Sequence, residues 1–270
     1  MRFLLDRYAA GEHVAVWVEL GELGASVRQA PFYSDALAVA RETMRRARYN
    51  IERLVARLRL LDYQFGYDWW VAEFRDMLEY DPPPPVFARP QAQVEHQLTE
   101  LERRVGILPL ALRAWYEQVG AVNFVGMYPI HDATDPNGFT NYVQFTRSGA
   151  RDRDKYFSDE YFSHDVDPLF VDSLDHILQR PAMPSRTGSG YEIDLAPDEW
   201  LKYGVSGGGP YVITAPNPAA DAILENEWHE TTFVNYLRTC FRWGGFPGLE
   251  CKTRRPEREL AFLTEDLLPI

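Results

Sequence analysis

Apolar residues repeat at helical spacing in two neighbouring stretches near the middle of the chain. The side chains that share one face of each stretch are Leu98, Leu101 and Val105, then Leu112, Trp115 or Tyr116, and Val119. Gly106 suits the end of the first helix, and Pro109 suits the first turn of the second, where its missing N–H would go unused. Gly120 closes the second helix, and Val122 and Phe124 alternate as in a strand. The pattern predicts a helix–turn–helix–strand unit that is buried on its Trp115 side.

The first 80 residues are predicted to be helical. Val16, Leu20, Leu23 and Val27 keep helical spacing, although the alternation of valines over residues 14–18 would also fit a strand. Pro31 interrupts this helix, and Ser34 is a candidate N-cap for the longest predicted helix, which runs from about Asp35 to Leu61.

The polar face of that long helix is rich in arginine, which raises the question of nucleic-acid binding. Glu42 and Glu52 partly offset the arginines, residues 1–80 hold 11 basic and 12 acidic groups, and only one aromatic residue, Tyr49, lies among the arginines. The pattern therefore favours a solvated face or one paired with acidic residues elsewhere in the chain.

Proline composition divides the chain. Pro82 to Pro85 are consecutive and favour an extended spacer. The sequence thus predicts a helical N-terminal segment (1–80), a Pro-rich linker (81–90), an α+β domain (91–255) and a C-terminal tail (256–270). Within the third part, strands are predicted at 128–130, 142–145, 167–171 and 191–195, and residues 203–216 are predicted to form a glycine turn that feeds a strand. Residues 221–236 are predicted to be helical, with Phe233, Leu237 and Phe241 on one face, and Gly244 and Gly245 end this helix.

Charge is distributed unevenly along the chain. The net charge is −12, and residues 151–240 alone hold 16 acidic and 7 basic groups. Such a region repels nucleic acid and anionic lipid and attracts a basic partner, although an acidic face also simply favours solubility. Two cysteines, the absence of a cleavable-signal layout at the N-terminus and the absence of an apolar run of about 18–20 residues predict a cytoplasmic protein.

Several stretches have the residue types of active sites but not their context. Ser206 to Gly209 lacks the lysine of a phosphate loop, and Gly204–Gly208 fits the nucleophile-elbow formula but precedes a strand instead of a helix. Two acid–histidine clusters could ligate a metal but lack zinc or calcium spacing: His131, Asp132 and Asp135, and His164, Asp165 and Asp167. No enzyme activity, metal or cofactor is therefore predicted.

The helix–turn–helix stretch resembles the opening signature of the SMI1/KNR4 family, the SUKH superfamily. The residues that carry the resemblance are Glu102, Val105-Gly106, Leu108-Pro109, Leu112-Arg113, Trp115-Tyr116 and Val119-Gly120. Asp167-Pro168-Leu169 and the late helix followed by Gly244-Gly245-Phe246-Pro247 are also similar to the family. The resemblance covers roughly residues 90–250 and implies an α+β fold with a mixed or antiparallel sheet packed by helices. The first 80 residues and the acidic insertion lie outside it.

The resemblance implies a binding protein, and many bacterial members are immunity proteins that neutralise a toxin, often a nuclease. The sequence therefore predicts a protein that occludes a basic toxin domain, with a regulatory scaffold or an uncharacterised hydrolase as alternatives. We predict that the partner-binding residues lie in the acidic, aromatic-rich insertion, since aromatic anchors and complementary charge are typical of interfaces. They are Asp152, Asp154, Tyr156, Phe157, Asp159, Glu160, Tyr161, Phe162, Asp165 and Asp167.

Overall fold

The structure is a computed structural model that describes residues 3–66, 85–127, 166–186, 188–198, 202, 209–251 and 256–270. In the described residues, helices and short antiparallel strands alternate along the chain, which confirms the predicted α+β class. The helices are α1 (Phe3–Ala9), α2 (His13–Glu22), η1 (Gly24–Arg28), α3 (Tyr33–Leu60), α5 (Val94–Val105), α6 (Leu110–Gln118), α8 (Leu174–Gln179), α9 (Phe233–Arg242), η4 (Pro247–Cys251) and α10 (Glu257–Thr264). The strands are β1 (Gln64–Phe65), β2 (Phe87–Ala88), β3 (Ala121–Asn123), β4 (Gly126–Met127), β5 (Phe170–Val171), β6 (Met183–Pro184), β7 (Tyr191–Ala196) and β8 (Tyr211–Ala215).

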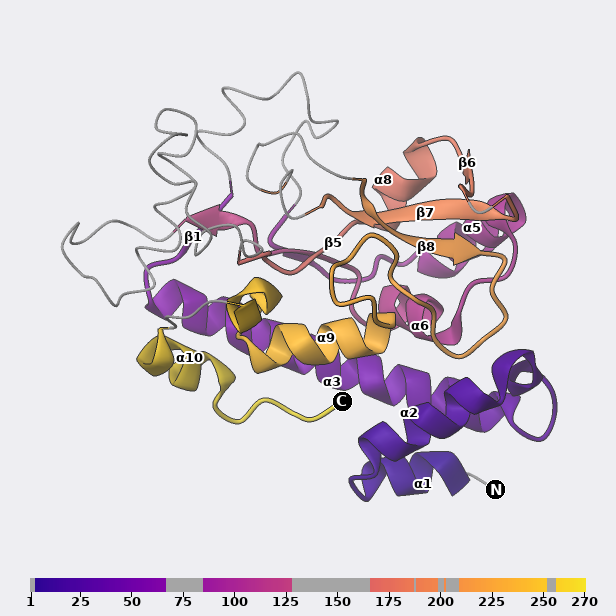
Figure 1. Ribbon diagram of the computed structural model, residues 1–270, viewed down its shortest axis with the longest axis horizontal. Helices are drawn as coiled ribbons and strands as arrows, with labels where there is room; N and C mark the ends of the chain where they lie inside the picture. The colour runs from indigo at the N-terminus through magenta and orange to yellow at the C-terminus, as the bar shows by residue number, and fades with distance from the viewer. Residues whose placement is uncertain are drawn as a thin grey trace.

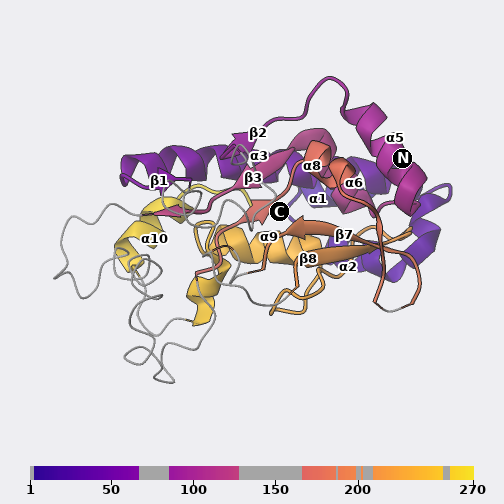
Figure 2. The same cartoon turned by 90° about the horizontal axis from the view of Figure 1, so that it is seen from above.

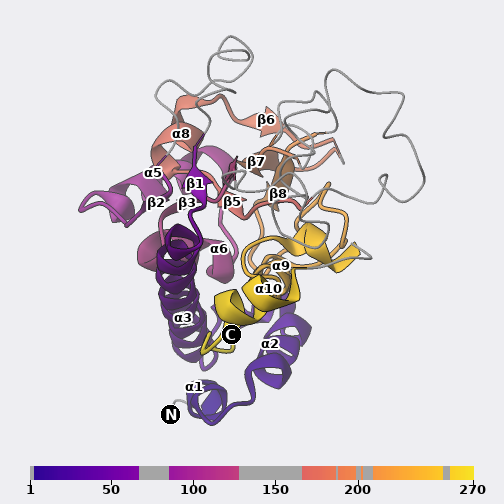
Figure 3. The ribbon, with the colours of Figure 1, turned by 90° about the vertical axis from the view of Figure 1, so that its left-hand side faces the viewer.

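The long helix α3 runs through the middle of the molecule (Figure 1). Helix α6 packs along one side of it, α1 along another, and α10 near its C-terminal end. Viewed almost along α3, α6 and the strands lie above it, α1 lies below it and α10 lies to one side (Figure 3). One hydrophobic core includes buried residues from Leu4 to Ile270, so the N-terminal helices and the C-terminal residues belong to the same core as the strands.

Four polar side chains are buried along α3, and the three that lie C-terminal to Asp35, namely Thr43, Asn50 and Arg57, each bind a different neighbour. Thr43 accepts a hydrogen bond from the indole N–H of Trp17 in α2 at 3.0 Å. The Asn50 side chain donates to Leu268 O at 2.9 Å and accepts from Leu268 N at 2.7 Å. Arg57 donates to the carbonyl oxygens of Leu263 and Glu265, at the C-terminal end of α10. Because an unpaired buried polar group is costly, these bonds fix the register of each neighbour on α3.

The stretch that resembles the SMI1/KNR4 signature forms α5, a turn, α6 and β3, as predicted. Leu101, Leu112, Trp115 and Val119 are all buried, and the Trp115 indole N–H donates to Gly120 O at 2.7 Å. The two helices are joined by an ion pair in which Arg113 Nη1 lies 2.9 Å from Glu102 Oε2. Because Leu101, Leu112, Trp115 and Val119 are buried, this stretch forms part of the hydrophobic core.

A distant segment supplies the hydrogen-bond acceptors at the start of α6. Leu110 N and Ala111 N donate to the carbonyl oxygens of Ala219 and Ala220 at 3.2 and 2.8 Å. The first N–H groups of a helix have no partner within the helix, so these carbonyls take the place of an N-cap side chain. Arg28 donates to the carbonyl oxygens of Leu108 and Pro218 and ties the turn to the N-terminal helices.

The strands form two three-stranded antiparallel sheets, ordered β2-β3-β5 and β6-β7-β8, and a β1-β4 pair. Strand β7 pairs with β8 from Tyr191↔Ala215 to Ala196↔Tyr211, with a register shift between Asp194 and Ala196. Ile193 and Leu195 of β7 are buried, as the alternation in the sequence predicts. Seen from above, α9 lies on the same side of the molecule as β7 and β8 (Figure 2).

The arginine face of α3 is largely paired with acidic residues. Arg41 Nε lies 2.6 Å from Glu117 Oε2 of α6, and Arg46 Nε lies 2.8 Å from Glu42 Oε1. Arg48 also pairs with an acidic residue of the same helix. The sequence predicts such pairing of the arginines with acidic residues as one of two alternatives to a nucleic-acid surface.

Four details of the sequence prediction are wrong. Helix α3 begins at Tyr33, one residue before the proposed N-cap Ser34. Residues 87–88 of the proposed linker form β2, because they pair with β3. Residues 257–264 of the proposed tail form α10. The helix expected from residue 221 begins only at Phe233, because residues 221–232 instead form two isolated bridges, Val212↔Glu225 and Ile223↔Thr232.

No helix in the described part of the chain is both long enough and apolar enough to cross a membrane.

Gly120 offers a direct test of how β3 joins α6. Its φ is +95°, and a Cβ there would overlap the carbonyl oxygen of Ala88 in β2. We expect Gly120→Ala to lower the free energy of unfolding by about 3 kcal/mol in urea titrations. Gly21→Ala is the matched control, because Gly21 lies within α2 with nothing near its Cβ position. Equal losses of unfolding free energy in Gly120→Ala and Gly21→Ala would contradict the close approach of Gly120 to the Ala88 carbonyl.

Candidate partner-binding region

Nine of the ten residues predicted to bind a partner lie outside the described residues: Asp152, Asp154, Tyr156, Phe157, Asp159, Glu160, Tyr161, Phe162 and Asp165. The same holds for His131, Asp132, Asp135, His164 and Ser206. The tenth, Asp167, directly follows this segment and is described. The described part of this region consists of Asp167 and the residues around it.

Asp167 does not belong to an exposed acidic surface, which corrects its predicted role. Its side chain is completely buried and forms an ion pair with Lys202, whose side chain is also completely buried. Asp167 has φ +47°, a conformation that aspartate tolerates better than most residues. A carboxylate enclosed in this way cannot touch the surface of a partner, so we assign it to holding the chain in place.

Aromatic and thiol groups surround the ion pair. Lys202 Nζ lies 4.6 Å from the centre of the Tyr211 ring, and the Tyr211 and Tyr236 rings pack edge to face at 6.3 Å. Burial raises the pKa of the Tyr236 hydroxyl and of the Cys240 thiol well above their ordinary values. Both groups are therefore neutral at physiological pH. Because the Lys202 amine is paired and enclosed, the cluster fits a structural anchor better than a nucleophilic site.

Backbone hydrogen bonds fix the residues on either side of Asp167. Gly248 N donates to Val166 O at 3.1 Å, and Leu169 N donates to Gly245 O at 2.8 Å. Leu169 O in turn accepts from Phe124 N at 2.8 Å. The chain that follows the acidic segment is thus bound to the turn after α9 and to the strand after α6.

Next to this cluster, one histidine lies between two carboxylates. His229 Nδ1 bonds to Glu227, which is buried, and His229 Nε2 lies 3.1 Å from Glu250 Oε2. Burial opposes a charge on His229, but the hydrogen bonds and charges of Glu227 and Glu250 outweigh burial and raise its pKa. The imidazole is thereby used as a bridge between the turn before α9 and η4.

A serine, a histidine and an aspartate meet at the start of α8, but not in the geometry of a hydrolase. Ser173 Oγ accepts from His176 N at 3.2 Å and so acts as the N-cap of α8. His176 Nδ1 lies 2.5 Å from Asp172 Oδ2, and Arg180 Nη2 lies 3.1 Å from His176 Nδ1 and 3.3 Å from His176 Nε2. In a triad the second ring nitrogen faces the serine hydroxyl. Here the Ser173 hydroxyl is bonded to the backbone N–H of His176 and a guanidinium lies against the ring, so the group serves as a helix cap and charge network.

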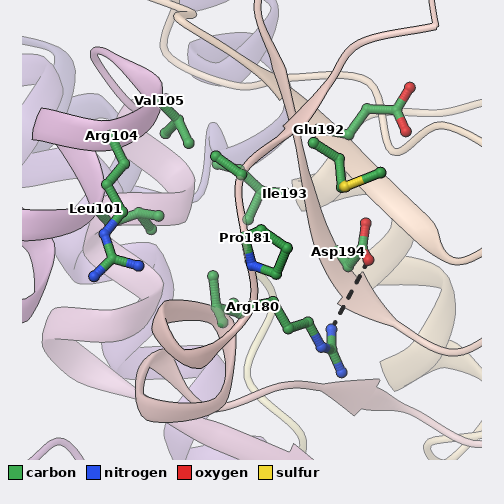
Figure 4. A pocket seen from close by; sticks show the side chains of 11 residues that line it. Leu101, Arg104, Val105, Arg180, Pro181, Glu192, Ile193 and Asp194 are labelled. Carbon is green, nitrogen blue, oxygen red and sulfur yellow. Dashed lines mark ion pairs between the residues drawn. The ribbon is translucent and has the colours of Figure 1, made fainter.

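A small cavity lies between α5, α8 and β7 (Figure 4). Arg104 and Arg180 lie at its edges, and Arg180 Nη1 is 4.0 Å from Asp194 Oδ2. Its volume of about 30 Å³ admits roughly two water molecules. Ligand pockets are commonly about 300–1,000 Å³. This cavity is therefore too small for an organic substrate.

Within the residues that the structure describes, no group of three or more histidine, cysteine, aspartate or glutamate side chains is placed to hold a metal ion. Comparisons with protein-family models, curated proteins and solved structures found no match. The resemblance to the SMI1/KNR4 family therefore stays a prediction.

Sequence reasoning missed Lys202 and Glu227, which are both buried. One signal was present for Lys202, because this single lysine stands between Trp200-Leu201 and Tyr203 in an apolar stretch. Such a lysine is a candidate for a buried pair. The identity of its partner, 35 positions earlier in the chain, has no local signal.

The ion pair can be tested with a double-mutant cycle. Removing the amine alone leaves an uncompensated buried carboxylate, so we expect Lys202→Met to lower the free energy of unfolding by about 3–5 kcal/mol. Adding Asp167→Asn, which keeps a residue tolerant of positive φ, should restore at least about half of that loss. If the free-energy losses of the two single variants, measured by chemical denaturation, add up to the loss of the double variant, the two side chains do not interact.

The His229 bridge predicts a pH dependence of stability. A histidine whose pKa is raised in the folded state stabilises the fold fully below its unfolded pKa of about 6.5, and this contribution is lost as the pH rises through the folded pKa. Wild-type stability should therefore fall as the pH is raised above 6.5, and His229→Gln should reduce that fall. The control is His96→Gln, since His96 is exposed on α5. Identical pH profiles for wild type and His229→Gln in thermal unfolding would refute the bridge.

Proposed function

We propose that this chain is a non-enzymatic binding protein of the SMI1/KNR4 (SUKH) type, an immunity protein that occludes a basic toxin domain such as a nuclease. The observation that carries the proposal is the concentration of acidic residues, 16 against 7 basic, within residues 151–240. Nucleases present basic surfaces to their substrate, so an acidic binder matches the field of the nucleic acid that it displaces.

The described residues support this proposal through the way the acidic segment is attached. Asp167 and its backbone neighbours are held by Lys202, Gly245 and Gly248, two positions after Asp165, the last of the nine predicted contact residues that lie outside the described part. Ordering of a binding surface before association lowers the entropic cost of binding. The buried pair fixes the described end of the chain next to the acidic segment and need not touch the partner.

The described part of the chain also has acidic side chains that are exposed to solvent. Glu230 is exposed on the turn before α9, and Glu225 and Glu250 are partly exposed nearby. Charges of one sign spread over a surface accelerate the diffusional encounter with an oppositely charged protein, and salt weakens this effect. A toxin must be captured quickly to be neutralised, so steering of this kind suits the proposed role.

The proposal is tested by charge reversal in the acidic segment. The partner is first captured from the native host with the full chain and identified, and its affinity is then measured over a range of salt concentrations. We expect Asp159→Lys combined with Glu160→Lys to weaken binding at least about tenfold at low salt and to flatten the salt dependence.

The matched control reverses two charges outside the acidic third of the chain, Glu257→Lys with Glu259→Lys in the first turn of α10. This control should leave affinity within about twofold of wild type. Equal effects of both pairs, or turnover of a captured small molecule by the chain, would reject the proposed function.

A further inference from the structure

One buried histidine joins the N-terminal helices to the rest of the protein. His13 is the first residue of α2 and is 6% exposed. Its ring stacks on the ring of Tyr8 in α1, with 4.7 Å between the ring centres. Arg46 Nη1 of α3 lies 2.6 Å from His13 Nε2, and Arg238 Nη2 of α9 donates to His13 O at 3.1 Å. Three other helices therefore contact α2 at this single residue.

The contact with Arg46 requires a neutral imidazole. A guanidinium has only N–H donors, so His13 Nε2 is the acceptor and the ring proton lies on Nδ1. Protonation of the ring would direct a second N–H at the guanidinium and add a positive charge next to Arg46 and Arg238. Burial and these two arginines accordingly lower the pKa of His13 below its ordinary value.

Two cations and one neutral phenol face His13 from the neighbouring helices. Arg46 of α3 is itself paired with Glu42, whose Oε1 lies 2.8 Å from Arg46 Nε. Tyr8 of α1 stays neutral at physiological pH, because burial raises the pKa of its hydroxyl. Arg238 of α9 is the second cation. Within the described residues His13 forms no ion pair with a carboxylate, so no group there stabilises a protonated ring.

The same two arginines hold residues 269–270. Arg46 Nη1 donates to Pro269 O at 3.1 Å, and Arg238 Nε donates to Ile270 O at 2.7 Å. The end of the chain accordingly lies near α2 (Figures 1 and 3). A displacement of Arg46 from His13 would therefore disturb the N-terminal helices and residues 269–270 together.

We infer that His13 is an acid-sensitive joint, whose protonation breaks the bond with Arg46 and loosens α1, α2 and residues 269–270 from α3 and α9. A buried neutral histidine stabilises the fold above its unfolded pKa of about 6.5, and this contribution is lost as the pH falls from there through the folded pKa. The response is opposite in sign to that of the His229 bridge, because the pKa of His229 is raised. The inference does not rest on the proposed function.

The test measures amide hydrogen exchange of the full chain at pH 7.5 and pH 5.0, expressed as protection factors, in wild type and in His13→Gln. Glutamine accepts a hydrogen bond from Arg46 through its amide oxygen but takes up no proton. Protonation of an opened His13 favours opening by up to about 30-fold at pH 5.0. Between the two pH values, protection of residues 3–22 should fall at least about fivefold more than that of α5 in wild type. In His13→Gln this difference should be less than about twofold.

His96→Gln is the matched control, since His96 is exposed on α5, and it should behave as wild type does. A second measurement covers the case in which His13→Gln does not fold. Titration by NMR should give His13 a lower pKa than His96 in the wild-type chain, and Arg46→Gln should raise the pKa of His13. The inference is overturned if protection of residues 3–22 falls equally in wild type and His13→Gln, or if the pKa of His13 is not below that of His96.

Discussion

The buried polar side chains of α3 determine how the rest of the protein packs. Thr43, Asn50 and Arg57 lie along one helix, and each finds its partner on a different element: α2, the residues after α10, and α10 itself. Apolar contacts alone would let these elements slide along α3, whereas a buried hydrogen bond is lost if the register changes. The N-terminal helices and the C-terminal residues are therefore inseparable from the core, and removing residues 1–80 would remove the centre of the fold.

Periodic elements were predictable from the sequence, and contacts between distant residues were not. The spacing of Leu98, Leu101 and Val105 predicted α5 because one helical face supplies its burial. Residues 221–232 looked helical, yet Glu225 pairs with Val212 in a bridge that depends on β8 being nearby. Asp167 looked like a surface acid because its partner, Lys202, is far away in the chain. Tertiary pairing overrode local pattern at both positions.

The acidic region of the chain combines a large net charge with a fixed end. Residues 151–240 hold 16 acidic and 7 basic groups, an excess that acts on an oppositely charged protein at long range. Close to the first described residue after the acidic segment, Asp167 and Lys202 form a completely buried ion pair. Charge of this kind affects the rate of encounter, whereas close packing determines how long a complex lasts.

We propose that the partner binds the acidic segment next to the Asp167–Lys202 ion pair. Hydrogen–deuterium exchange of the full chain, with and without the captured partner, tests it directly. We predict that the partner slows exchange within residues 151–165 and leaves α3 and α5 unchanged. Slower exchange confined to other parts of the chain, with residues 151–165 unaffected, would contradict the account.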